Sequence, residues 1–131
     1  MVTLIVEDDF TSRLILQEML KSYGPVYIAV NGREAVELVR ATVESDEYYD
    51  LICLDILMPE MDGQQTLKEI RALEDASRLI SPHRAKIVMT TGLGDTDTVS
   101  DAIRGQCDHF LVKPIQKAKL LQVLRKLRLV I

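Results

Sequence analysis

The feature that most constrains this 131-residue chain is a short, mostly apolar run of strand character, Tyr49 to Leu54, that ends on the carboxylate of Asp55. Pro59 and the Asp62-Gly63 pair follow it and indicate that the chain turns there. Such a run favours a buried strand of a parallel sheet with helices on both faces. An acid at the end of that strand lies where open α/β sheets bind ligands, although a lone Asp could equally be a loop residue or a helix N-cap.

Strand and helix patterns alternate along the rest of the chain. The segments with strand character are residues 2–6, 26–30, 86–91 and 108–112, in addition to the run before Asp55. Helical spacing of apolar residues is found in 11–23, 35–43, 67–73, weakly in 95–105, and from about Gln116 to Ile131. Residues 74–84 are polar and are predicted to form a helix end and a long surface loop. Five βα units of this kind predict one doubly wound α/β domain over residues 1–131, with right-handed crossovers.

Composition narrows the classes of function. A formal net charge of −4 argues against direct binding of nucleic acid, which requires a basic face. No apolar run approaches the ~18 residues of a membrane span, and the first residues read as a strand rather than a signal peptide. Two isolated cysteines do not make a disulfide framework or a zinc site, and Cys53 is expected to be a small buried hydrophobe. We therefore expect a cytoplasmic protein that does not contact the membrane.

Chemically reactive residues follow four of the predicted strands. Glu7 and Asp8 come after the first strand, Asp55 ends the third, Thr91 ends the fourth, and Lys113 follows the fifth. Because the carboxyl ends of parallel strands meet at one edge of a sheet, these side chains can converge on one crevice. Three acids gathered there repel one another and raise one another's pKa. Mg²⁺, which prefers carboxylate oxygens and a phosphate, would relieve that repulsion.

These residues resemble the motifs of a response-regulator receiver domain, the phosphoacceptor of two-component signalling, of the kind found in chemotaxis receivers. The resemblance covers the whole chain, and the 22 residues between Thr91 and Lys113 fit the family. The interval from Asp55 to Thr91 is longer than usual because of residues 74–84. The motifs are Val6-Glu7-Asp8, Leu54 to Pro59 with Met61-Asp62-Gly63, Thr91-Gly92, and Phe110 to Pro114.

The resemblance implies a flavodoxin-like (βα)₅ fold with a parallel sheet of strand order 2-1-3-4-5. It also implies that Mg²⁺ is bound by Asp8, Asp55 and the backbone carbonyl of Leu57, with Glu7 acting through water. Asp55 would accept a phosphoryl group from the phosphohistidine of a histidine kinase or phosphotransfer protein. Thr91 and Lys113 would contact the phosphoryl oxygens.

Further expectations concern the local geometry and the output. The family implies a cis peptide bond between Lys113 and Pro114, and Asp9 is expected to cap the first helix. Phosphorylation should draw Thr91 inward, allow Phe110 to turn from exposed to buried, and so switch a surface that binds a downstream effector protein or an effector domain. Thr90 is the alternative to Thr91, but strand alternation and the spacing to Lys113 favour Thr91.

Three other functions are considered. A phosphatase of the haloacid-dehalogenase type needs a second Asp two residues after the nucleophile, and Leu57 stands there. A flavin carrier needs phosphate-binding donors in its first loop, where this chain has Glu7-Asp8-Asp9. An interaction module that is never phosphorylated usually lacks one of the acids, the Thr or the Lys, and this chain keeps them all. The sequence thus predicts a signalling module that assists only its own phosphorylation and dephosphorylation, rather than an enzyme.

Overall fold

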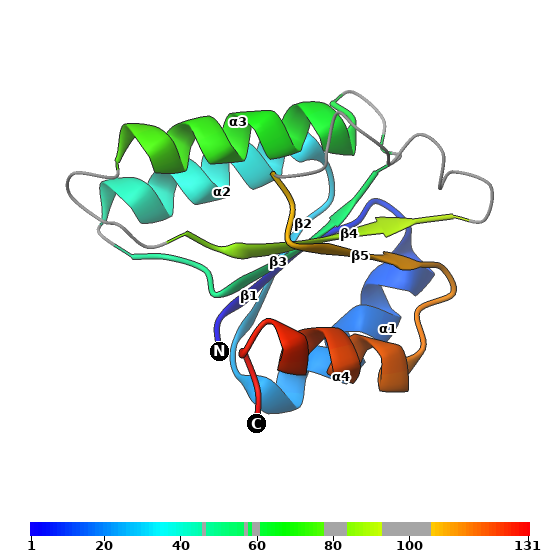
Figure 1. Cartoon of the computed structure of the whole chain (residues 1–131). Coiled ribbons are helices and arrows are strands. Elements are labelled where there is room, and N and C mark those ends of the chain that lie inside the picture. Colours follow the sequence, from blue (N-terminus) through cyan, green and yellow to red (C-terminus); the bar gives the residue numbers. More distant parts are fainter. Residues whose placement is uncertain (46, 57, 59–60, 78–83, 93–105) are drawn as a thin grey trace.

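Five parallel strands form one sheet in the computed structural model of the chain (Figure 1). The structure describes residues 1–131 except 46, 57, 59–60, 78–83 and 93–105. The strand order β2-β1-β3-β4-β5 confirms the predicted flavodoxin-like fold. The strands are β1 (Thr3–Val6), β2 (Val26–Ala29), β3 (Leu51–Asp55), β4 (Lys86–Thr91) and β5 (His109–Val112).

Helices cover both faces of the sheet, as predicted. α2 and α3 pack on one face, while α1 and α4 pack on the other (Figure 1). A short 3₁₀ helix, η1, continues α1 up to the turn at Gly24. The helix expected within residues 95–105 lies outside the described residues. The helices are α1 (Phe10–Leu20), η1 (Lys21–Tyr23), α2 (Gly32–Glu44), α3 (Gly63–Ala76) and α4 (Lys117–Lys126).

β3 is the centre of the core because every one of its residues is buried. Ile52 and Leu54 point into the cluster under α2 and α3, whereas Leu51 and Cys53 point into the cluster under α1 and α4. Burial raises the pKa of the Cys53 thiol to about 12, so this side chain acts as a small hydrophobe, as expected. A strand buried on both faces explains why the sequence before Asp55 is continuously apolar.

Side-chain caps begin three of the helices. Asp9 accepts a hydrogen bond from the Ser12 amide at 2.9 Å, which confirms its predicted role as the N-cap of α1. Asn31 caps α2, and Asp62 caps α3 by accepting from the Gln65 amide at 2.8 Å. Each cap satisfies a backbone donor that the first helical turn leaves without a partner.

The last helix is shorter than the sequence indicated. α4 ends at Lys126, although the apolar spacing predicted a helix up to Ile131. Arg128 takes a left-handed backbone conformation with φ of 61°, and the Leu129 amide donates back to the Leu124 carbonyl at 2.9 Å. This is the hydrogen-bond pattern of a Schellman ending, which usually has Gly at the left-handed position. Because Arg128 occupies that position, the sequence contains no glycine to indicate that the helix ends there.

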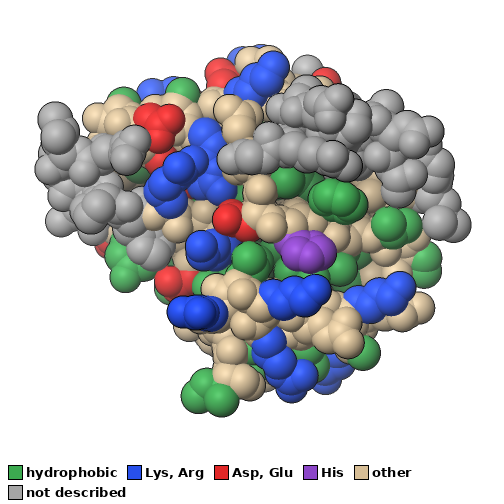
Figure 2. Space-filling view, viewed as in Figure 1, with side chains coloured by type: hydrophobic (Ala, Val, Ile, Leu, Met, Phe, Trp, Pro, Cys, Tyr) green, Lys and Arg blue, Asp and Glu red, His purple; other side chains and the backbone are tan. Residues whose placement is uncertain are grey.

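The charges are distributed unevenly over the fold. Every acidic residue precedes Lys113, and the chain from there to Ile131 is purely basic in its charged side chains. Figure 2 shows lysine and arginine side chains gathered on the face where α4 and β5 lie. None of the described helices is long and apolar enough to cross a membrane. The basic residues in that last part of the chain are Lys113, Lys117, Lys119, Arg125, Lys126 and Arg128.

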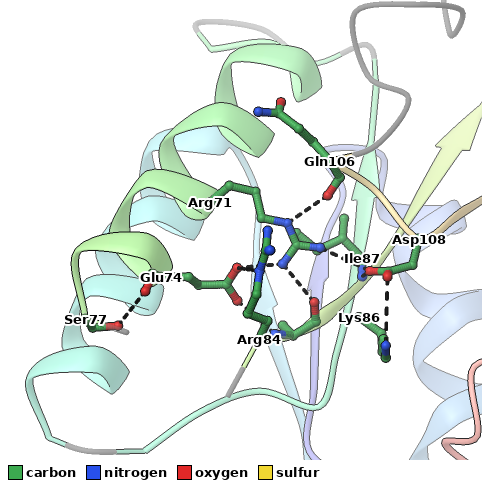
Figure 3. A network of polar contacts seen from close by, with 9 residues as sticks. Arg71, Glu74, Ser77, Arg84, Lys86, Ile87, Gln106 and Asp108 are labelled. Atoms are coloured by element: carbon green, nitrogen blue, oxygen red, sulfur yellow. Dashed lines mark hydrogen bonds and ion pairs between the residues drawn. The ribbon is translucent and has the colours of Figure 1, made fainter. Parts of the chain in front are cut away.

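Glu74, the first residue of the polar segment 74–84, belongs to a buried ionic network (Figure 3). The helix end predicted in this segment is present, since α3 ends at Ala76, and residues 78–83 of the predicted loop lie outside the described residues. Glu74 lies inside α3, is 6% exposed, and forms an ion pair with Arg71, which is 5% exposed. The Glu74 carboxylate also accepts a hydrogen bond from the Ala85 amide at 2.8 Å. The sequence analysis was therefore wrong to place Glu74 in a solvated segment: its partners are distant in sequence and cannot be seen in local periodicity.

Arg71 connects three parts of the chain through its guanidinium group. Nε donates to the Gln106 carbonyl at 2.7 Å, and Nη1 donates to the Ala85 carbonyl at 2.9 Å as well as to Glu74. Nη2 donates to Asp108 at 3.1 Å, and the same Asp108 oxygen accepts from the Ile87 amide at 2.8 Å. α3 is thereby joined to the beginnings of both β4 and β5 by a planar donor that few other side chains could replace.

Replacing Arg71 by Met should destabilise the protein by about 3–5 kcal/mol, because the buried Glu74 carboxylate would lose its buried cation and Asp108 would lose one of its donors. Arg71→Lys should recover only part of this loss, since an ammonium cannot reproduce the four contacts of the fork. The measurement is the free energy of unfolding in urea. Arg40→Met is the matched control: Arg40 makes one exposed ion pair with Glu37 at 3.6 Å, which should contribute at most ~1 kcal/mol. Equal effects of Arg71→Met and Arg40→Met would show that the network is not a source of stability.

Candidate functional site

Acidic side chains from two strands meet at the carboxyl edge of the sheet. Glu7 and Asp8 directly follow β1, and Asp55 is the last residue of β3, which pairs with β1 in parallel. One carboxylate oxygen from each of the three lies within 4.8 Å of those of the other two. The convergence that the sequence predicted for these three residues is therefore present in the fold.

Lys113 brings a positive charge to this cluster from the end of β5. Its Nζ atom lies 2.7 Å from Glu7 Oε1 and 3.3 Å from Asp55 Oδ2. The Lys113 amide donates to the Thr91 carbonyl at 2.6 Å, so the backbone of the lysine is fixed against the end of β4. The Lys113–Pro114 peptide bond is cis, as predicted.

Burial makes the charges at this site costly. Glu7 is 1% exposed and Asp55 is 5% exposed, whereas Asp8 is open to solvent. Burial and the neighbouring Glu7 carboxylate together raise the pKa of Asp55 to about 7, against the opposing effect of Lys113. Burial alone would lower the pKa of Lys113, but the contacts with Glu7 and Asp55 outweigh it and raise the pKa. The lysine therefore stays positively charged.

Two residues support the site through contacts that the sequence analysis did not predict. Gly63, the first residue of α3, packs so closely on β3 that a Cβ atom there would lie 2.3 Å from the Asp55 carbonyl oxygen. The Gly63 amide also donates to the Ile56 carbonyl at 2.8 Å. Arg13 of α1 donates from Nη1 to the Glu7 carbonyl at 3.1 Å. The Asp62-Gly63 pair was a visible turn signal, but its contact with Asp55 becomes apparent only in three dimensions.

The donor set suits a hard cation such as Mg²⁺. All three side chains offer oxygen, and Glu7 Oε1 is buried with Lys113 as an ion-pair partner but no well-aligned hydrogen bond from the described residues. Oxygens at these separations need only small movements to bind one octahedral ion. The fourth predicted ligand, the Leu57 carbonyl, lies outside the described residues. The residues present thus fit the metal that the acids predicted.

The threonine predicted for the site is near it but does not contact the acids in the described structure. Thr91 ends β4, is buried, and donates its hydroxyl to the Gly92 carbonyl at 3.3 Å. Thr90, the alternative, is also buried and lies directly opposite Asp55 in the strand pairing. The role assigned to Thr91 stays a prediction.

Comparison with known proteins agrees with this site. The family described as "Response regulator receiver domain" matches residues 3–125. The chain belongs to the response regulator receiver family. It is therefore a phosphoacceptor signalling module rather than a classical enzyme, and its family implies a histidine kinase as partner.

Three relatives show how receiver domains of this kind are used. The chemotaxis protein CheY of Bacillus subtilis is 34% identical over 125 residues, which are 94% of this chain and 93% of CheY. The transcriptional regulatory protein ZraR of Escherichia coli K12 is also 34% identical, but the chain spans only 25% of its length. The receiver domain of the sensor histidine kinase PA1611 of Pseudomonas aeruginosa is 27% identical with a TM-score of 0.75, and the match covers 97% of each chain. Its crystal structure has a magnesium ion coordinated in the active-site cleft.

The stability of the metal-free receiver domain should fall as Asp55 ionises. Because the folded-state pKa of Asp55 is raised from 3.8 to about 7, its contribution is fully present below pH ~4 and is lost as the pH rises through ~7. At pH 8, the free energy of unfolding of Asp55→Asn should therefore be about 1–3 kcal/mol higher than that of wild type, after allowance for solvent screening.

The measurement is urea unfolding in EDTA at pH 5 and at pH 8, where the gap between the two proteins should be clearly larger at pH 8. Adding Mg²⁺ at pH 8 should stabilise wild type more than Asp55→Asn, because the variant has lost one ligand charge. A pH-independent gap would contradict the assignment of the buried charge to Asp55.

Proposed function

We propose that residues 1–131 act as one receiver domain that accepts a phosphoryl group on Asp55 from a phosphohistidine. The donor would be a histidine kinase or a histidine phosphotransfer protein. The observation that carries this proposal is the position of Asp55: its carboxylate lies beside two further acids and 3.3 Å from the Lys113 ammonium, at the end of the central strand. Two observations support Mg²⁺ as the metal: the three carboxylates offer the oxygen ligands that it prefers, and the chain is similar to the magnesium-bound PA1611 receiver domain.

The transfer forms one bond and breaks another. An Asp55 carboxylate oxygen attacks the phosphorus of the donor phosphohistidine, and the bond between phosphorus and the imidazole nitrogen breaks with its electron pair left on the nitrogen. Asp55 must be ionised to attack, and the adjacent Lys113 ammonium favours that state. Lys113 would then stay near the phosphoryl oxygens and stabilise their charge.

Asp8 and Asp55 would bind the metal directly, the Leu57 carbonyl would be a third ligand, and Glu7 would act through a water molecule. When bound, Mg²⁺ would offset the charge of the acids and of the phosphoryl oxygens. The protein contributes to the transfer by positioning charges. Glu7 is buried against Lys113, so the orientation of both side chains is fixed before the donor arrives. The chain thus mainly positions the reacting groups.

The output we propose is a change of the surface around β5. Phe110 is 37% exposed on this strand, beside the Thr91 and Lys113 end of the sheet. A phosphoryl group that draws the Thr91 hydroxyl toward Asp55 would leave room for Phe110 to become buried. A downstream effector, either a separate protein or a domain of the same polypeptide, would read that change. The cytoplasm, where a histidine kinase presents its phosphohistidine, is the proposed location.

Incubation with a small acyl-phosphate donor should add one phosphoryl group to the protein, only in the presence of Mg²⁺ and only on Asp55. Asp55→Asn should abolish the labelling, and Asp8→Asn should slow it by about tenfold or more at limiting Mg²⁺, because a direct ligand is lost. Intact-protein mass spectrometry and peptide mapping provide the measurement.

Asp9→Asn is the matched control for these acid-to-amide changes. Asp9 is the next residue along the chain, but it caps α1, and Asn is an equally good cap. Its labelling should stay at the wild-type rate. Labelling that survives both Asp55→Asn and EDTA would reject the proposed phosphoacceptor.

Thr91→Ala should leave phosphorylation of Asp55 possible but uncouple it from the surface change. In wild type we expect phosphorylation to shift the amide resonances of residues 106–112, and in Thr91→Ala we expect these shifts to be mostly lost. Thr90→Val, at the other buried threonine of β4, is the control and should keep the shifts. If Thr90→Val abolishes the shifts and Thr91→Ala retains them, the two threonines have been assigned the wrong way round.

A further inference from the structure

An aromatic groove lies at the opposite edge of the sheet from the acidic site. It has a volume of about 480 Å³ and is lined by Val2 just before β1, by Tyr27 of β2, by Thr42 near the end of α2, and by residues 47–50 of the connection into β3. Tyr27 and Tyr48 are 51% and 50% exposed, and the rings of Tyr27 and Tyr49 meet edge to face with centroids 6.0 Å apart. A pocket of this size can hold a side chain of a ligand together with part of its backbone.

The polar groups that line this groove are acidic. Glu47, which is exposed, and Asp50 both line it. Asp50 Oδ2 accepts a hydrogen bond from the Val2 amide at 2.7 Å, while Oδ1 has no hydrogen bond to any described residue. Burial, followed by the neighbouring Tyr27 and Glu47, raises the pKa of Tyr49, so its phenol stays neutral. The groove therefore combines aromatic rings with two negative charges.

The end of α2 adds to this negative potential. Thr42, in the last turns of the helix, lines the groove, and the last turn contains no lysine or arginine. A helix C-terminus carries a partial negative charge that a cation stabilises. Tyrosine ring faces attract cations as well. Rings, carboxylates and helix end all favour the same ligand chemistry, which is a positively charged group.

The groove is next to an open strand edge. β2 is the outer strand of the sheet, and the carbonyls of Pro25 and Ala29 accept hydrogen bonds from the amides of Thr3 and Glu7. Because parallel pairing uses alternate residues, the backbone groups of Val26 and Ile28 face the open side. An extended peptide can pair with such an edge, and its alternate side chains then point into neighbouring pockets.

We propose that this groove binds an arginine of a partner protein whose extended segment pairs with the open edge of β2. Arginine fits better than lysine because its planar guanidinium can stack on a tyrosine ring while it donates to a carboxylate in a forked geometry. Glu47 and Asp50 supply the carboxylates, and Tyr27 supplies an exposed ring. Binding here is separate from phosphoryl transfer at Asp55, because the groove lies at the amino-terminal ends of the strands.

The test is an NMR titration of the full ¹⁵N-labelled chain with the peptide acetyl-Val-Thr-Arg-Thr-Val-amide. The reference peptide has citrulline in place of arginine, which keeps the shape and removes the charge. We expect the arginine peptide to shift the amides of residues 26–29 and 47–50, and to bind about five- to thirtyfold more tightly than the citrulline peptide. A third peptide with lysine should bind several-fold more weakly than the arginine peptide.

Two variants locate the binding site. Tyr27→Leu removes a ring face at a half-exposed position, and Glu47→Gln removes one carboxylate at an exposed position, so each should keep the fold, which the amide spectrum checks. Each should reduce the preference for arginine over citrulline about threefold or more. Glu18→Gln is the matched control, because Glu18 is an exposed acid on α1 that pairs with Lys21. Equal binding of the arginine and citrulline peptides, shifts confined to other surfaces, or no binding at millimolar peptide would overturn the proposal.

Discussion

The mutual repulsion of carboxylates at one edge of a parallel sheet is the constraint on which the site depends. Parallel pairing of β1 with β3 forces Glu7 and Asp55 to the same edge, and burial removes the water that would otherwise separate their charges. Lys113 partly offsets this repulsion by contacting both carboxylates, and its backbone is fixed by the end of β4. The charged groups at this edge are therefore oriented before any ligand arrives, which is the main advantage of a preorganised site.

Much of the fold and of the acidic cluster could be predicted because their signals are local. A buried parallel strand is apolar at every position, so β3 and the acid that ends it were evident from the residues themselves. The cap Asp9 was visible for the same reason, as a side chain placed just before a helical pattern.

What the sequence did not predict depends on partners that are distant along the chain or on backbone geometry. Glu74 looked like a solvent-exposed acid because its buried neighbours, the Arg71 fork and the Ala85 amide, are set by tertiary packing. The end of α4 was missed because Arg128 adopts the left-handed conformation that Gly would normally signal. The close packing of Gly63 on Asp55 was also not predicted, because it depends on how α3 packs against β3.

The Arg71 network also bears on how much the length of the connection between α3 and β4 can change. The guanidinium and Glu74 hold Ala85 to α3, so the chain is fixed on both sides of the connection between Ser77 and Ala85. When both ends of a connection are anchored in this way, doubling its length adds only about 0.6 kcal/mol of closure entropy. The long interval between Asp55 and β4 is therefore compatible with an undisturbed acidic cluster. Insertions, affinity tags or whole reporter domains placed between Ser77 and Ala85 should be better tolerated than the same additions at the acidic edge of the sheet.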